Sequence, residues 1–241
     1  IKVLDFFYQY SLPIHLNPFL YWLALLIVLD FAYYVLHVVD HQSRFFWAIH
    51  VTHHSSELFN LTTGFRSSVL QPLYRFIYFI PLSLLGFKTI DILFMHSICQ
   101  TWGVLVHTKY IKKLPAWIEY IFVTPSHHRV HHASNVLYLD RNMGMFLIIW
   151  DRIFGTFQAE EEWEKIRYGL THEQEKVNPA NIITHEWSAI WKDMKKSSNW
   201  LDKIKYIFYP PGWSHDGSMK TSNQLRAEMY PQNVRDTDPK G

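Results

Sequence analysis

The chain has 241 residues, of which 15 are histidine and only one is cysteine. The single cysteine, Cys99, excludes a disulfide scaffold, a zinc site built on cysteine pairs and a cysteine-ligated iron–sulfur cluster, so any bound metal would be held by imidazole. A formal net charge of +2 without a basic stripe argues against nucleic acid as a partner.

Charged residues are distributed unevenly along the chain. Residues 1–157 contain 19 Asp, Glu, Lys and Arg, about 12%, whereas residues 158–241 contain 25, about 30%. This contrast predicts a membrane-embedded catalytic part over 1–157 and a charged peripheral cap and tail over 158–241, within one domain. The fold class expected is all-α, an integral membrane helical bundle.

Three apolar runs are the candidate membrane helices. The first, 18–39, contains one charge, Asp30, and is long enough to cross a bilayer. Runs 69–87 and 89–107 meet at a short polar break, 86–88, which predicts a helical hairpin. The chain begins without methionine, which leaves room for further membrane helices before it. The alternative is a large helical protein whose apolar helices pack on one another in water.

The second hairpin arm carries a polar stripe. His96, Gln100, Gly103 and His107 fall within about 60° of one another on a helix. Polar side chains at membrane depth are costly unless they face a protein interior, so this stripe is expected to face something polar.

Histidines gather in three clusters with spacings of three and four, which place side chains on one helical face. The clusters are His37-x3-His41, His50-x2-His53-His54 and His128-x2-His131-His132. A lone histidine on an apolar face is more often a core residue, but eight imidazoles together would repel if protonated and be poorly satisfied if neutral and unligated. A metal site resolves both problems. His127 lies about 90° from its cluster's centre, which favours a supporting or structural role.

Eight or nine imidazoles are too many for one ion, because zinc takes four ligands and octahedral iron takes six. The clusters therefore predict two ions, and imidazole alone does not distinguish iron, copper, nickel and zinc. His107, at the end of the hairpin, is a ninth candidate ligand. His96 lies about 16 Å further along that helix and cannot reach the same ion.

All clusters are expected on one side of the membrane, because the first helix ends at His41 and the hairpin crosses and returns at His107. Most of the basic residues of 1–157 are expected on that same side of the membrane, which predicts that the metal site faces the cytoplasm. Asp30, at membrane depth on the same helix face as His37, is expected to hydrogen-bond a ligand histidine.

The motifs resemble the membrane fatty acid hydroxylase and sterol desaturase superfamily over about residues 26–185. The resemblance rests on Asp30-x2-Tyr33-Tyr34-x2-His37-x3-His41, on Trp47-Ala48-x-His50-x2-His53-His54-Ser55-Ser56-Glu57 with Asn60, on His127-His128-Arg129-Val130-His131-His132, on Asp140-x-Asn142-x-Gly144, on Trp150-Asp151-Arg152-x-Phe154-Gly155-Thr156-Phe157 and on Tyr168-Gly169-Leu170-Thr171-His172. The stretches 53–57 and 150–157 are similar to the alkylglycerol monooxygenases and their bacterial relatives.

This resemblance implies a non-haem di-iron oxidoreductase that uses O2 to hydroxylate a lipid C–H bond, as in O-alkyl cleavage of ether lipids with tetrahydrobiopterin as reductant. It implies as ligands His37, His41, His50, His53, His54, His107, His128, His131 and His132. The chain departs from the family pattern at Val38, Gln42 and Gly103, where relatives have arginine, glutamate and, in some hydroxylases, histidine.

Other polar and aromatic residues near the motifs are candidates for support and substrate binding. Candidates to orient ligands or protons are Asp30, Glu57 and Asn60, with His127, Gln100, His96, Asp140 and Asn142 as further supporting residues; the substrate groove is expected at Tyr34, Phe76, Phe79 and Trp102.

The chain contains no dinucleotide, haem or cysteine-cluster motif, so electrons would come from a reduced pterin or a small redox protein. The alternatives are a sterol or fatty acyl desaturase or hydroxylase and, in a different class, a membrane metal-binding or transport protein. A metalloprotease is excluded, because His172-Glu173 and His185-Glu186 lack the second histidine of His-Glu-x-x-His. The expected location is the endoplasmic reticulum in a eukaryote or the inner membrane in a bacterium.

Overall fold

The computed structural model describes residues 1–66, 70–171 and 178–231, and these form helices and loops without a β-strand, which confirms the all-α class. The helices are α1 (Lys2–Tyr8), α2 (Pro18–Gln42), α3 (Arg44–His54), α4 (Leu61–Gly64), α5 (Pro72–Arg75), η1 (Phe76–Phe79), α6 (Ile80–Leu84), α7 (Thr89–Leu105), α8 (Ala116–Ile121), α9 (Pro125–His131), η2 (Val136–Tyr138), α10 (Ile149–Ile153), α11 (Pro179–Met194), α12 (Trp200–Phe208) and α13 (Ser222–Met229).

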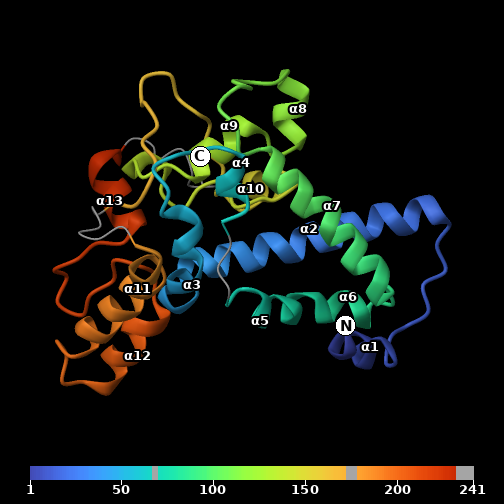
Figure 1. Cartoon of the computed structure of the whole chain (residues 1–241), viewed down its shortest axis with the longest axis horizontal. Helices are drawn as coiled ribbons and strands as arrows, with labels where there is room; N and C mark the ends of the chain where they lie inside the picture. Colours follow the sequence, from blue (N-terminus) through green and yellow to red (C-terminus); the bar gives the residue numbers. More distant parts are fainter. Residues whose placement is uncertain (67–69, 172–177, 232–241) are drawn as a thin grey trace.

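Helix α2 is the longest helix and runs roughly along the long axis of the molecule (Figure 1). Its first turn is fixed by Asn17, whose side chain accepts a hydrogen bond from the Leu20 amide, and by Pro18, which needs no amide partner there. Within the described residues it is the one helix long and apolar enough to cross a membrane. Only 33% of its apolar window is buried, so most of those side chains are free to face lipid.

The first hairpin arm is not the continuous helix predicted over 69–87. In its described part the chain forms α5, η1 and α6 in succession. Pro72 begins α5 and Pro81 lies in the first turn of α6. A proline removes one backbone donor and its ring disturbs the preceding turn, so each one starts a new helix instead of extending the last. Val69 lies outside the described residues.

The predicted break between the arms is confirmed. Helix α6 ends at Leu84, α7 begins at Thr89, and Gly86 between them has a φ of +99°. A Cβ at this glycine would lie 2.3 Å from the Leu12 carbonyl oxygen, so both the backbone angle and the close approach require glycine.

The apolar core joins α2 to the hairpin. Leu25 and Leu29 of α2 are fully buried and belong to one hydrophobic cluster with Ile92 and Met95 of α7 and Leu4 of α1. This packing brings the two ends of α2 and α7 that carry histidines to the same end of the molecule (Figure 1).

The C-terminal part packs on α3 through α11. Arg44, at the start of α3, donates to Glu186 at 2.7 Å and pairs with Asp193 at 2.8 Å, and both carboxylates belong to α11. Helix α12 lies beside α11 (Figure 1). The predicted tail beyond 231 and His172 lie outside the described residues.

Candidate metal centre

The structure gathers the nine predicted ligand histidines into two adjacent groups. They come from the end of α2, from α3, from the turn after α7, and from α9 with its C-cap residue. One group is His37, His41, His50, His54 and His131; the other is His53, His107, His128 and His132. In each group one ring nitrogen of every histidine lies within 4.8 Å of the others.

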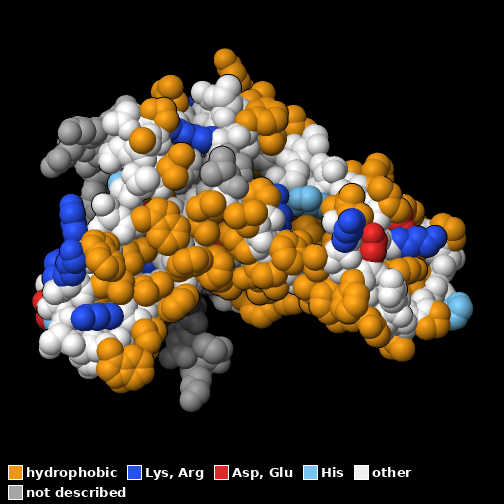
Figure 2. Space-filling view, turned by 60° about the horizontal axis from the view of Figure 1, so that its bottom comes forward, with side chains coloured by type: hydrophobic (Ala, Val, Ile, Leu, Met, Phe, Trp, Pro, Cys, Tyr) orange, Lys and Arg blue, Asp and Glu red, His pale blue; other side chains and the backbone are white. Residues whose placement is uncertain are grey.

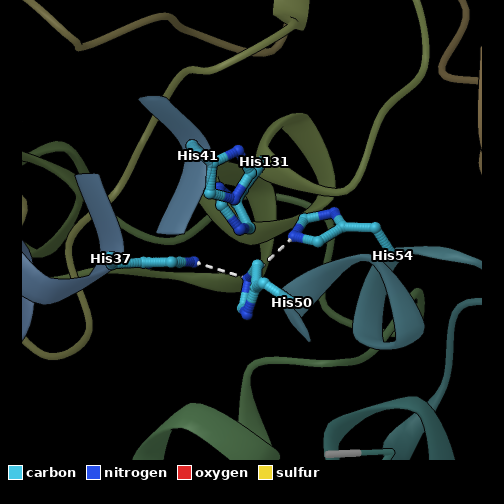
Figure 3. Close-up of side chains that lie close together, drawn as sticks. All are labelled: His37, His41, His50, His54 and His131. Carbon is cyan, nitrogen blue, oxygen red and sulfur yellow. Dashed lines mark hydrogen bonds between the residues drawn. The ribbon is translucent and has the colours of Figure 1, made fainter. Parts of the chain in front are cut away.

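In the first group His50 is the central imidazole (Figure 3). Its Nε2 lies 3.1 Å from Nε2 of His37 and 3.2 Å from Nε2 of His54. The rings of His41 and His131 complete the group, with ring centroids 5.0 Å apart. The side chains come from α2, α3 and α9, so the group exists only in the folded chain.

In the second group His107 takes the central place. Its Nε2 lies 2.9 Å from Nε2 of His128 and 3.1 Å from Nε2 of His132. The His54 ring of the first group stacks on the His132 ring of the second, with ring centroids 4.5 Å apart. The two groups are therefore immediate neighbours.

Backbone carbonyls fix the tautomers of several of these rings. The Nδ1 atoms of His37, His53, His107 and His131 lie 2.7–3.1 Å from the carbonyl oxygens of Met143, Arg66, Gly103 and Arg141, respectively. A carbonyl can only accept, so each Nδ1 carries the proton and each Nε2 presents a lone pair to the centre.

Converging lone pairs are unfavourable unless a cation lies among them. Around an ion with metal–nitrogen bonds of about 2.0–2.1 Å, neighbouring ligand atoms lie about 3 Å apart, which is the spacing seen here. Among the described residues, the buried Nε2 atoms of His41 and His131 also have no hydrogen-bond partner. The residues therefore fit two metal ions.

Burial keeps seven of these imidazoles in the neutral form, which is the form that binds metal. It lowers the pKa of His53 to about 3 and that of His107 to about 4, and it places the pKa values of His50, His54, His128, His131 and His132 well below the usual range. At neutral pH no proton has to be displaced from these seven imidazoles before a cation enters.

Asp140 is the predicted supporting residue that contacts a cluster histidine. Its carboxylate lies 3.0 Å from Nδ1 of His41 and also accepts from the Ser222 hydroxyl. Asp140 has a φ of +52°, a left-handed conformation that aspartate tolerates better than most residues. This contact leaves the Nε2 of His41 directed at the first group.

The prediction that Asp30 hydrogen-bonds a ligand histidine is wrong. Its carboxylate accepts hydrogen bonds from the amides of Phe146 and Leu147, at 2.9 and 3.0 Å, and from the Trp150 indole at 3.0 Å, not from a histidine. Asp30 therefore holds the loop that precedes α10. That loop contains Met143, whose carbonyl orients His37, so Asp30 acts on the centre only through the backbone.

Glu57, Asn60 and Asn142 do not touch the cluster imidazoles within the described structure. Glu57 is exposed beside Gly169. Asn60 caps α4 by accepting from the Thr62 amide. Asn142 donates to the carbonyls of His127 and Gln158, which shapes the loop after η2.

His127, His96 and Gln100 lie outside both groups. His127 faces the Glu119 carboxylate at 3.1 Å. His96 lies 3.2 Å from the guanidinium of Arg75, so the polar stripe of α7 faces an arginine on the broken first arm. Gln100 lines a small cavity between that arginine and the histidines.

Two cavities border the centre. The larger, about 320 Å³, lies on the α11 side and reaches both groups, through His41, His54 and His131 of the first and His132 of the second. The smaller, about 50 Å³, lies on the α7 side and also touches both groups.

The predicted groove residues line neither of these cavities. Tyr34 stacks on Phe154, Trp102 packs on Phe146, and Phe79 packs on His96. The fourth, Phe76, is half-buried in η1. These aromatic side chains pack the protein instead.

Gly103 replaces the histidine of some relatives, and the structure shows what fills the space. A Cβ there would lie 2.4 Å from Sδ of Met145, and both residues line the smaller cavity. The sulfur of Met145 therefore occupies the position next to the second group that a longer side chain at 103 would take.

Two buried carboxylates near the centre, Asp40 and Asp151, were not among the predicted supporting residues. Asp40 accepts from Tyr74 at 2.6 Å and Gln71 at 3.0 Å, and lies 3.7 Å from Nδ1 of His50. Asp151 accepts from the Met143 amide at 2.6 Å. The signal for Asp40 was present, because it is a second carboxylate in α2, directly before His41.

A helical chain with one candidate membrane span and nine converging imidazoles has the features of a histidine-rich metal-binding protein. The sequence matches the fatty acid hydroxylase family over residues 22–156, a range that contains all nine histidines. The chain belongs to this family.

Relatives of known name agree with this assignment. The chain is 40% identical over 194 residues to alkylglycerol monooxygenase of Homo sapiens and 38% identical over 200 residues to that of Xenopus tropicalis, covering 80% and 82% of this chain. It is 29% identical over 148 residues, 61% of this chain, to the ornithine lipid hydroxylase OlsE of Rhizobium tropici. The chain spans only 42%, 43% and 44% of these three proteins, and no solved structure matches it significantly.

Proposed function

We propose that the nine histidines hold two iron ions and that the chain is a membrane oxygenase that hydroxylates a C–H bond of a lipid with O2. The observation that carries the proposal is the convergence of Nε2 atoms whose tautomers are fixed by backbone carbonyls. Iron held there would supply the activation of O2. The proposed site faces the cytoplasm in a multi-pass membrane protein.

In this proposal the protein's own groups position ligands and shelter the reaction. Asp140 and the carbonyls of Met143, Arg66, Gly103 and Arg141 hold the imidazoles in the metal-binding tautomer. The larger cavity is the place for the reacting part of the lipid, because it touches histidines of both groups and its volume is about 320 Å³, whereas the smaller cavity has about 50 Å³. Electrons come from an external donor, a tetrahydropterin or a small redox protein.

The substrate class proposed first is an ether lipid, cleaved at its O-alkyl bond, because the alkylglycerol monooxygenases are 38–40% identical to this chain. Hydroxylation or desaturation of a sterol or fatty acyl chain is the second candidate. It is favoured by the similarity to OlsE and by Val38 and Gln42, which depart from the family pattern.

Two measurements test the proposal. Metal analysis of the purified protein should give two irons per chain, and one ion or none in iron-replete protein would overturn the di-iron centre. Aerobic lipid analysis of membranes that contain the protein, with and without tetrahydropterin, identifies the substrate. Ether-lipid loss with aldehyde formation supports the first class, new hydroxyl groups or double bonds support the second, and metal uptake without oxidation would indicate a transporter.

A further inference from the structure

The hairpin of α11 and α12 carries an apolar face that no described residue covers. On α12, Trp200, Leu201, Ile204 and Phe208 fall within a sector of about 100°. Their side chains are 65%, 48%, 43% and 53% exposed. A nine-residue helix with so narrow an exposed apolar face is amphipathic and must meet an apolar partner or medium.

Helix α11 extends this face. Ile183, Trp187 and Trp191 recur every fourth residue and form one stripe, of which Ile183 and Trp191 are exposed. The ring of Phe45 in α3 lies 5.2 Å from that of Trp187 and 6.1 Å from that of Phe208. The apolar sides of α11 and α12 therefore meet at Phe45.

The position of Phe45 connects the hairpin to the end of the candidate membrane span. Phe45 follows Gln42, the last residue of α2, by three residues, which is at most about 11 Å of chain. Its neighbour Phe46 contacts Tyr74 of α5, on the broken arm, at a ring distance of 4.9 Å. Figure 2 shows hydrophobic side chains continuing from the lobe of α11 and α12 across the front of the molecule.

Lysines border the apolar face as they do in helices that lie on a bilayer. Lys203 and Lys205 lie about 90–110° from the centre of the α12 face, one on each side. The ammonium of Lys205 lies over the rings of Tyr209 and Trp213, and that of Lys195 lies over Trp191. Apolar stems beside aromatic rings, with amino groups at the edge, suit lipid headgroups.

We propose that the α11–α12 hairpin lies in the surface of the bilayer that α2 crosses, with Trp191, Trp200, Leu201, Ile204 and Phe208 at headgroup depth. This proposal rests on the membrane location in the proposed function, and not on the chemistry of the metal centre. Helix α11 also supplies Asn181, His185 and Glu186 to the wall of the larger cavity. A docked hairpin would therefore place that cavity beside the headgroups, where a lipid can reach it laterally.

Spin-label depth measurement tests the proposal on the full chain in vesicles of phosphatidylcholine and phosphatidylglycerol. The native Cys99 is only 1% exposed, so a cysteine introduced on the surface is the site that labels. A nitroxide is attached at Ile204→Cys or, as a second reporter on the same face, at Leu201→Cys. The matched control is Lys192→Cys, an exposed position of α11 about 140° from its apolar stripe.

The labels at 204 and 201 should collide more with dissolved O2 than with a water-soluble nickel complex, and the label at 192 should do the reverse. Equal access of nickel to all three labels would overturn the proposal. If both reagents were excluded at 204 and the nitroxide spectrum were broadened by a label on another chain, a second copy would cover this face. That result would also overturn the proposal. Iron content measured on the same samples distinguishes a failure of the metal proposal, because the label depth does not depend on it.

Discussion

The carboxylate of Asp140 lies 3.0 Å from Nδ1 of His41, so a loop residue in a left-handed conformation sets the direction of an imidazole on α2. The contact spans 99 residues of sequence. It leaves Nε2 of His41, which has no hydrogen-bond partner in the part of the chain that the structure describes, directed at the first histidine group.

Replacing Asp140 by alanine should weaken metal binding at the first group. Loss of a group that orients a ligand histidine typically costs about 10–100-fold in metal affinity. Competition with a chelator measures the change. The control is Asp216→Ala, whose exposed carboxylate accepts hydrogen bonds from Ser218 and contacts no cluster histidine within the described residues; equal affinity in both variants would exclude the role of Asp140.

Replacing His53 by alanine should remove one of two ions. His53 belongs to the second group, and the three remaining histidines there are a poor site, whereas the first group keeps all five. Iron analysis should fall from two to one per chain, with the helical circular dichroism unchanged. His15→Ala, a substitution at an exposed histidine of the N-terminal loop, should keep both ions; two ions in His53→Ala would remove that residue from the site.

Replacing Asp30 by alanine should destabilise the protein more than it affects the metals. The change leaves the Phe146 and Leu147 amides and the Trp150 indole without their acceptor. A buried donor without a partner costs about 1–3 kcal/mol, so a loss of about 3 kcal/mol or more is expected.

Thermal unfolding in detergent checks this cost, with Asp91→Ala as the control. Asp91 accepts one hydrogen bond, from Tyr21 at 2.7 Å, and should cost less. If Asp30→Ala kept its stability and lost iron instead, Asp30 would have to act directly on the centre.

The metal-free protein should lose stability on acidification. Burial lowers the pKa of His53 to about 3 and of His107 to about 4, below the value of about 6.5 in an unfolded chain. On acidification the unfolded chain therefore binds protons at a higher pH than the folded chain does. The free energy of unfolding is unaffected by these groups above about pH 6.5 and falls as the pH drops towards 4.

Unfolding of the chelated protein at pH 7.5 and 5.0 measures this effect. The His53→Gln variant removes one of the titrating groups and should lose less stability over the same interval. A metal-free protein that became more stable at pH 5.0 would contradict neutral imidazoles in the folded state.

The histidine groups were predictable because their spacing is local: clusters at spacings of three and four occupy helix faces in any helical fold. Asp30 was recognised as a buried carboxylate, but its partners are 116–120 residues away and no local pattern names them. The prediction of the substrate groove was wrong for a related reason. The sequence does not reveal whether aromatic residues on a helix face pack on protein or line a cavity.

The first hairpin arm was less predictable than its composition suggested. Its high content of apolar residues indicated a membrane-spanning helix. Pro72 and Pro81, which are visible in the sequence, instead decide where the helices begin. The break at 86–88 was predicted correctly because a glycine and a lysine between two apolar runs are local signals, and Gly86 adopts the positive φ that glycine permits.

Four of the nine imidazoles are oriented by carbonyl oxygens of the main chain, at Arg66, Gly103, Arg141 and Met143. Every residue type has that oxygen, so no single substitution at these positions deletes the acceptor. The side chain of Met145, which lines the smaller cavity, could therefore be replaced by another while the imidazoles keep their direction. In an evolving lineage, this arrangement separates the geometry of the centre from the side chains that shape the space around it.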